Sequence, residues 1–161
     1  MPTISLFIMS IVMYGYGINN DLYQQMQEST MHITGGCHCG QITYEAEADP
    51  IESVICHCTD CQNISGAPYR TTVYVNEKKF TLYGTLKTYI KTADNGNLRE
   101  QNFCPDCGSH IYATSVGDTN REFGIRLGTC HQRDQLPPKR QYYCTSAQSW
   151  VQDLSGIEKA E

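Results

Sequence analysis

The first 69 residues of this 161-residue chain contain no lysine or arginine. The first of these residues in the sequence is Arg70. A secretory signal carries bases before its apolar segment, and a membrane span needs about 20 apolar residues. The apolar run at residues 4–12 meets neither condition. Over the whole chain, 12 Lys and Arg face 17 Asp and Glu, a net charge of −5, which gives no electrostatic support for binding nucleic acid or anionic lipid. We therefore expect a cytoplasmic protein without a nucleic-acid or membrane partner.

Extended helical periodicity is also scarce, and one short helix near residues 58–64 is the only one expected after residue 31. Residues 41–47 instead alternate, with Ile42, Tyr44 and Ala46 on one face, as in a half-buried strand. Further strands are expected at residues 69–75, 79–83, 85–91, 98–103, 110–114, 122–128 and 141–144. The turn-forming stretch 91–97 should join two of them as a hairpin. The sequence therefore predicts an all-β domain of short strands.

The chain length suits one domain. Its β pattern and its cysteines begin after residue 31, so we expect the domain to cover residues 31–152. Residues 1–30 then form an N-terminal extension of unknown role, and residues 153–161 form a C-terminal tail.

Nine cysteines are present, and seven of them lie in three tight clusters. The clusters are Cys37-x-Cys39, Cys56-x-Cys58-x-x-Cys61 and Cys104-x-x-Cys107. Cysteines this close in sequence seldom form good disulfides with each other, but their sulfurs can converge on one ion. An odd total also leaves at least one thiol outside any intrachain pairing. Metal thiolates in a reducing compartment are therefore the preferred interpretation.

Cys104 and Cys107 have the spacing of a zinc knuckle, which needs a second pair of ligands to complete a tetrahedron. Cys37 and Cys39 supply that pair, and the glycines around them let the backbone approach a metal closely. We therefore predict one closed site with four cysteine ligands. A zinc site without an open position is structural.

The remaining cluster offers three thiolates within six residues, Cys56, Cys58 and Cys61. Three protein ligands plus an open position are typical of catalytic zinc, so we predict two Zn²⁺ ions per chain, the second one catalytic. Three alternatives stay open at this point: a closed second site with His57, Cys130 or Cys144 as fourth ligand, a different grouping of the cysteines, and an iron–sulfur cluster.

The segments GGCHCGQITYE, ICHCTDCQNISGAPYR and FCPDCGSHIY together resemble the glutathione-dependent formaldehyde-activating enzyme family, which is related to the CENP-V domain. The resemblance covers residues 32–151. It implies a zinc-stabilised, tent-like fold of short antiparallel strands. It also implies the same division of the cysteines, with Cys37, Cys39, Cys104 and Cys107 at a structural zinc and Cys56, Cys58 and Cys61 at a catalytic one.

The resemblance further implies a carbon–sulfur lyase or synthase that joins formaldehyde to glutathione. Three thiolates make the second site net negative, which favours binding of the thiol substrate over polarisation of the aldehyde. Asp60 is a candidate general base, although its position also suits helix capping. Arg70, Lys87 and Lys91 are candidates to bind the carboxylates of a glutathione-like thiol, and the amides of residues 65–67 are candidates to line its pocket.

Two other classes of function compete with this hypothesis. A binding module would use both zinc ions for structure alone, and a zinc-handling or redox-responsive protein would use Cys56, Cys58 and Cys61 as a labile site. The partners expected for the enzyme are a small aldehyde and a thiol, and a homo-oligomer is compatible with the sequence.

Overall fold

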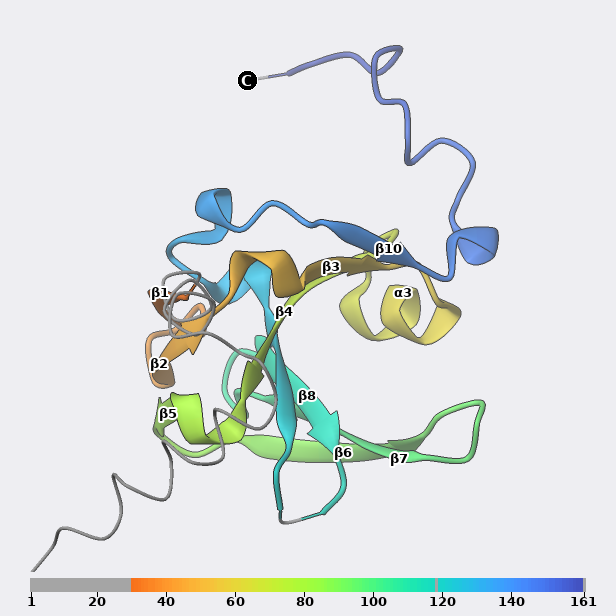
Figure 1. The fold of residues 1–161 in the computed structure, drawn as a ribbon. Coiled ribbons are helices and arrows are strands. Elements are labelled where there is room, and N and C mark those ends of the chain that lie inside the picture. The colour runs from red at the N-terminus through yellow and green to blue at the C-terminus, as the bar shows by residue number, and fades with distance from the viewer. Residues whose placement is uncertain (1–29, 118, 161) are drawn as a thin grey trace, which may run out of the picture.

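The computed structural model describes residues 30–117 and 119–160, which form two β-sheets and one α-helix (Figure 1). The expected N-terminal extension, residues 1–30, lies outside the described residues except for Thr30. No helix in the described part of the chain is long and apolar enough to cross a membrane. The prediction of an all-β domain with little helix is confirmed.

The smaller sheet has three antiparallel strands in the order β1-β2-β5. These are β1 (Met31–Gly36), β2 (Thr43–Ala48) and β5 (Phe80–Tyr83). The alternation read from the sequence is present, because Tyr44, Ala46 and Ala48 of β2 are buried. Gly35 is required by packing within this sheet, since a Cβ atom there would lie 2.3 Å from the hydroxyl oxygen of Tyr44.

The larger sheet has seven strands in the order β10-β3-β4-β9-β8-β7-β6. Their bounds are β3 (Ser53–Cys56), β4 (Arg70–Asn76), β6 (Lys87–Thr92), β7 (Leu98–Phe103), β8 (His110–Ser115), β9 (Glu122–Arg126) and β10 (Arg140–Tyr142). Strands β6 and β7 form the predicted hairpin, whose turn includes Gly96 at φ +83°. The pairing of β10 with β3 is parallel and departs from the expected antiparallel pattern.

The helix α3 (Thr59–Ser65) follows β3 and confirms the short helix predicted there. Five 3-10 turns complete the regular structure of the described residues: η1 (Pro50–Glu52), η2 (Glu77–Lys79), η3 (Leu127–Thr129), η4 (Arg133–Gln135) and η5 (Cys144–Ser146). The strand expected at residues 141–144 ends earlier than predicted. Tyr143 adopts the left-handed conformation, with φ 57°, so that Cys144 begins a 3-10 turn instead.

The core lies between the two sheets and is built around packed aromatic rings. Phe80 of β5 contacts Tyr44 and Phe123, with ring centroids 5.6 and 5.2 Å apart, and Phe123 stacks on Tyr112 at 4.4 Å. From β4, Val73 and Val75 join this core. Because side chains alternate along a strand, Arg70, Thr72 and Tyr74 of β4 are directed to the opposite face of the large sheet. That face carries the candidate site.

Candidate metal centres and the adjoining cavity

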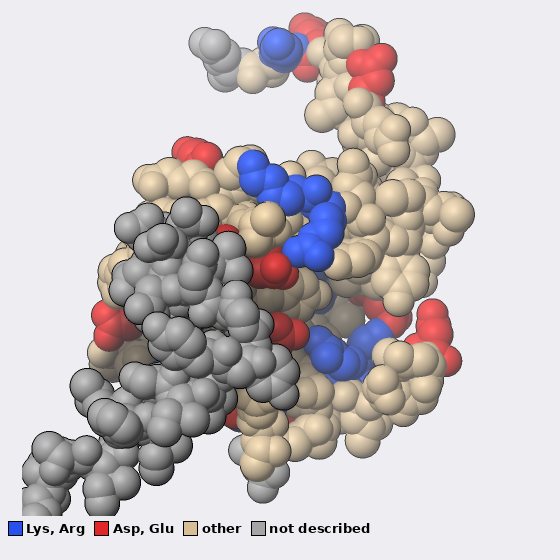
Figure 2. All heavy atoms as spheres, in the orientation of Figure 1, with Lys and Arg blue, Asp and Glu red and all other residues tan. Residues whose placement is uncertain are grey.

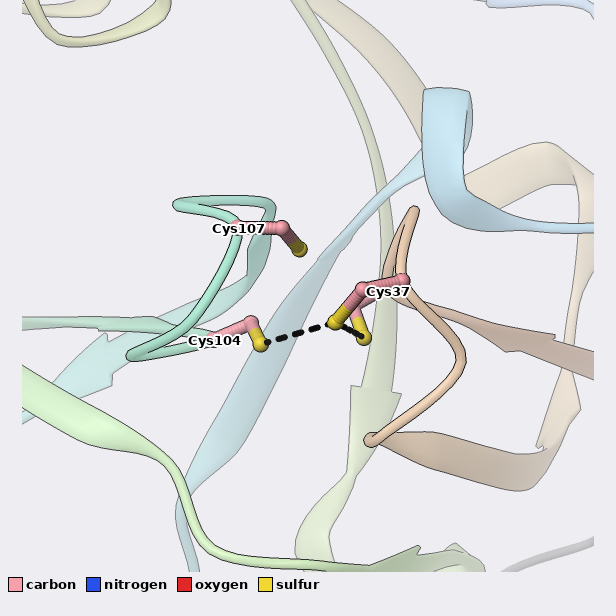
Figure 3. Close-up of side chains that lie close together, drawn as sticks. Cys37, Cys104 and Cys107 are labelled. Atoms are coloured by element: carbon pink, nitrogen blue, oxygen red, sulfur yellow. Dashed lines mark hydrogen bonds between the residues drawn. The ribbon is translucent and has the colours of Figure 1, made fainter.

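Four cysteine side chains converge between the loop after β1 and the loop after β7 (Figure 3). The sulfurs of Cys37, Cys39, Cys104 and Cys107 all lie within 4.8 Å of one another. The Sγ–Sγ distance is 3.4 Å from Cys37 to Cys39 and 3.7 Å from Cys39 to Cys104. Sulfurs that bind one tetrahedral zinc at about 2.3 Å are about 3.8 Å apart. The four residues therefore fit a zinc ion.

The backbone of the two loops explains how these sulfurs are held. The Cys37 sulfur accepts the amide of Ile42 at 3.2 Å, and the Cys104 carbonyl accepts the amide of Gly108 at 3.0 Å. Gly108 has φ +74°, a conformation that favours glycine. The amide of His38 donates to the side-chain oxygen of Ser109 at 3.0 Å and joins the two loops directly.

Hydrogen bonds in this cluster favour the thiolate form of two cysteines. The hydroxyl and then the amide of Ser109 lower the pKa of Cys107 to about 5. Burial acts against ionisation of Cys37, yet the Ile42 amide and the neighbouring thiols lower its pKa overall. A bound divalent cation would favour the thiolates further.

The second group consists of Cys56, Cys58 and Cys61, whose sulfurs also lie within 4.8 Å of one another. Cys56 ends β3, Cys58 is the N-cap of α3, and Cys61 lies in the first turn of that helix. The Cys56 and Cys58 sulfurs are 3.5 Å apart, and the Cys58 sulfur accepts the amide of Cys61 at 3.4 Å. The strand end and helix start therefore place three sulfurs at a spacing suited to one face of a metal ion.

The protonation of this group is unequal. A hydrogen bond from the Cys61 thiol is the largest cause that lowers the pKa of Cys56, which falls to about 5 although burial opposes it. The amide of Cys58 and the charge of Arg70 act in the same direction. The pKa of Cys61 is raised correspondingly, first because its thiol donates to Cys56 and second because of burial.

The structure places the alternative fourth ligands elsewhere. His57 is 2% exposed and its Nε2 lies 2.9 Å from the Gln141 side-chain oxygen. Cys130 is buried in the core between the sheets, and Cys144 is exposed in η5. Among residues 30–117 and 119–160, no further His, Cys, Asp or Glu joins the three sulfurs within 4.8 Å. The seven clustered cysteines thus gather in the two groups that their spacing predicts.

A cavity of about 460 Å³ adjoins the three cysteines and lies between β3, α3 and the β6–β7 hairpin. A space-filling view shows Lys and Arg side chains within a hollow at this side of the molecule, with acidic side chains near them (Figure 2). The volume falls in the usual range for small-molecule sites. The lining includes Cys56, Cys58, Asp60, Cys61, Arg70, Tyr74, Lys91, Asp94, Arg99, Gln101, Arg126 and Tyr143.

Strand register explains why distant residues meet in this cavity. Cys56 of β3 lies beside Arg70 of β4, and Thr72 lies beside Arg126 of β9. On the other side, Gln101 of β7 lies beside Ala113 of β8, which itself pairs with β9. All six side chains belong to the face of the large sheet that is turned away from the aromatic core.

Arg70 and Arg126 share one acceptor in the cavity wall. Arg70 Nη1 and Arg126 Nη2 donate to the side-chain oxygen of Gln101 at 3.1 and 3.0 Å. Arg126 Nη1 also donates to the hydroxyl of Thr72 at 3.0 Å. Burial, followed by the charge of Arg70, lowers the pKa of Arg126 to about 9. The two guanidinium groups therefore form a positively charged wall beside the three cysteines.

Of the other candidate residues, some line this cavity and some lie outside it. Asp60 and Lys91 both line the cavity and form an ion pair with each other across it. Lys87 is exposed and is not part of the cavity lining. The expectation for residues 65–67 is wrong, because Gly66 and Ala67 line a separate hollow near Trp150. They lie there because Gly66 ends α3 in the left-handed conformation.

The family model for glutathione-dependent formaldehyde-activating enzymes matches residues 32–146, which is most of the chain and includes all three cysteine clusters. The chain belongs to this family. The resemblance noted from the cysteine motifs is therefore confirmed.

A comparison with solved structures shows the same fold in a protein from Rhodobacter sphaeroides, a structural genomics target. The two chains share 18% sequence identity, and the match has a TM-score of 0.51. It covers 67% of this chain and 98% of the other. At this identity the likeness concerns the fold alone.

Sequence reasoning missed several residues of the cavity in this family member, among them Arg99, Gln101, Arg126 and Tyr74. Residues 99–102 of β7 are all polar, so no alternation marks Arg99 and Gln101 as members of one functional face. Arg126 follows the apolar residues of β9 and has no cysteine motif nearby. Only strand pairing places it next to Thr72 and Gln101.

Proposed function

We propose that this protein catalyses the reversible addition of a thiol, such as glutathione, to formaldehyde or a similarly small aldehyde. A carbon–sulfur bond forms between the thiolate and the carbonyl carbon. The carbonyl π electrons move to the oxygen, which takes up a proton and becomes a hydroxyl group. Membership of the family supports this general activity, and the reverse reaction is that of a carbon–sulfur lyase.

The observation that carries the proposal is the contrast between the two cysteine groups. The sulfurs of Cys56, Cys58 and Cys61 border a cavity of about 460 Å³, so a small molecule can reach them. In the other group, Cys37 and Cys104 are buried and Cys39 is exposed, but four sulfurs there already complete a tetrahedral set of ligands. Three ligands beside a cavity are typical of catalytic zinc, whereas four cysteine ligands are typical of structural zinc.

We assign a structural zinc to Cys37, Cys39, Cys104 and Cys107, where it would connect the loop after β1 to the loop after β7. Cys56, Cys58 and Cys61 would hold the second zinc. The distances between their sulfurs suit three ligands of one tetrahedral ion. When bound there, zinc lowers the pKa of a thiol ligand and makes a nucleophile available at neutral pH. Three cysteine thiolates leave such a site with a negative charge, and this favours thiol binding over strong polarisation of the aldehyde.

Other cavity residues supply charge and protons. Arg70 and Arg126 offset the negative charge of the three sulfurs. Burial raises the pKa of Tyr74, so that its hydroxyl keeps its proton at neutral pH and serves as a donor in the cavity. Asp60 remains our candidate general base, with Lys91 holding its carboxylate at the cavity edge.

The uncatalysed addition of glutathione to formaldehyde is itself reversible, so the test must measure a rate rather than product formation. Exchange spectroscopy by NMR, at equilibrium between the thiol and its hydroxymethyl adduct, reports the interconversion rate directly. We expect the wild-type protein to raise this rate and Cys58→Ser to abolish the increase.

Cys144→Ser provides the matched control, because Cys144 is exposed and lies outside both cysteine groups. This variant should retain the wild-type rate. A zinc-loaded wild-type protein that leaves the exchange rate at its uncatalysed value would overturn the proposed function.

A further inference from the structure

Three arginines in the cavity have no acidic partner. Arg70, Arg99 and Arg126 all line it, and none of them forms an ion pair with a carboxylate in the described residues. Arg70 and Arg126 donate only to neutral oxygens, those of Gln101 and Thr72. Arg70 is 6% exposed, so this charge is held almost out of contact with water.

The charges of the cavity do not balance without a ligand. Three thiolates with one divalent cation carry a single negative charge, against three positive charges from the arginines. Asp60 is already paired with Lys91, and Asp94 is exposed at the hairpin turn. An unpaired buried charge is costly. A surplus of positive charge therefore remains at the wall of the cavity, and a ligand with one or two negative charges would offset it.

The arginines also have hydrogen-bond donors to spare. Arg70 Nη2 and Arg126 Nε are buried and have no hydrogen-bond partner among the described residues. Arg126 and Arg99 are only partly buried, so their guanidinium groups can be approached from the cavity. Planar guanidinium groups bind carboxylates through paired hydrogen bonds.

We infer that Arg70, Arg99 and Arg126 form an oxyanion subsite that binds a carboxylate of the thiol substrate and selects carboxylate-bearing thiols over neutral ones. This inference rests on the proposed function for the nature of the thiol. Arg126 of β9 and Arg99 of β7 contact the carboxylate, and Arg70 supplies a further positive charge from the cavity wall. The subsite holds the substrate so that its sulfur faces Cys56, Cys58 and Cys61 in the same cavity.

The test uses a ligand that has the carboxylates but no free thiol, so that binding does not depend on sulfur chemistry. S-methylglutathione is titrated into the zinc-loaded full-length protein by calorimetry, and its diethyl ester, which keeps the amine but has no carboxylate, serves as the counterpart. We expect the acid to bind about tenfold or more tightly than the ester. Arg126→Gln should lose that preference, and its affinity for the ester should stay unchanged.

Arg140→Gln is the matched control, because Arg140 is exposed, pairs with Glu52 and lies outside the cavity lining. It should bind both ligands like the wild type. Arg126→Lys, which retains the positive charge without the planar fork, replaces Arg126→Gln if that variant does not fold. It should lose most of the preference for the acid.

Equal affinity of the wild type for acid and ester would overturn the inference, and so would an absence of binding by the acid. If Arg126 only balanced the charge of the metal site, Arg126→Gln would lose zinc more readily in a chelator competition. The same variant would then keep the preference for the acid, and this result would overturn the inference. A retained preference for the acid without acceleration of thiol–formaldehyde exchange would overturn the proposed function and leave the subsite standing.

Discussion

The sulfur atoms of Cys39 and Cys104 lie 3.7 Å apart, although 65 positions separate these residues in the sequence. Cys39 follows β1 of the small sheet, and Cys104 follows β7 of the large sheet. A metal held by both therefore connects the two layers on either side of the aromatic core. Binding energy of this kind is folding energy, because the unfolded chain does not present the site.

The two cysteine groups should respond differently to loss of a ligand. Cys104→Ser removes a buried ligand of the metal that would connect the two sheets. We expect the unfolding temperature of this variant to be lower than that of the wild type by about 10 °C or more. Cys58→Ser should stay folded and contain about half the wild-type zinc. Thermal unfolding and metal analysis measure both effects. Equal thermal destabilisation by the two substitutions would contradict the division into structural and catalytic sites.

Substitution of cobalt for zinc makes thiol binding visible. If a thiol enters beside Cys56, Cys58 and Cys61, its sulfur should add a charge-transfer band to the absorption spectrum and release a proton, since the metal lowers the thiol pKa below about 8.5. Cys56→Ala should lose this response and retain the spectrum of the four-cysteine group. An unchanged spectrum under saturating glutathione would show that no thiol binds the metal, and would favour the binding-module hypothesis.

A chain that begins at Met31 tests the proposed domain boundary. Met31 is the first residue of β1 and pairs with Ala48 of β2, and both cysteine groups follow it. We expect this shortened chain to fold, bind the same amount of zinc and retain any thiol–formaldehyde exchange activity. Circular dichroism and metal analysis check the outcome, and an insoluble or zinc-poor product would refute the boundary.

Glu77 and Arg121 provide a pH-dependent contribution to stability. The backbone amide of Arg121, and then its guanidinium group, lower the pKa of Glu77 below 4.5. A carboxyl whose pKa is lower in the folded state stabilises the protein above its unfolded pKa, and this contribution is lost as pH falls through the folded value. Arg121→Gln should therefore lower the unfolding temperature at pH 7, and the difference from wild type should narrow below pH 4.

Arg140→Gln is the comparison for this prediction too, because the ion pair of Arg140 with Glu52 is exposed. Exposed pairs of this type contribute little to stability. A difference between Arg121→Gln and wild type that stayed constant from pH 7 to pH 3 would contradict the role assigned to Glu77.

The grouping of the cysteines and much of the strand pattern could be predicted because both depend on neighbours in sequence. Cys56, Cys58 and Cys61 lie within six residues, and one-sided burial imposes alternation on Ile42, Tyr44 and Ala46. Strand β3 was not among the predicted strands, since four residues between a 3-10 turn and a cysteine motif are too few to show alternation.

The arginine wall of the cavity could not be predicted, because it depends on which strands become neighbours. Gln101 meets Arg70 across 31 positions and Arg126 across 25. No local pattern shows that β9 is placed between β4 and β8. Arg70 was a candidate, with Lys87 and Lys91, to bind the carboxylates of a thiol, but identifying Arg126, which shares Gln101 with it, required the sheet order.

The two outer strands of the large sheet also affect how copies of the protein meet. An edge strand with free backbone groups is a template for pairing with another chain, and short strands or positive side chains oppose this. At one edge, β10 covers the flank of β3 and is itself only three residues long, with Arg140 at its start. At the other edge, β6 carries Lys87 and Lys91. Edge-to-edge aggregation is therefore disfavoured at both ends of the sheet.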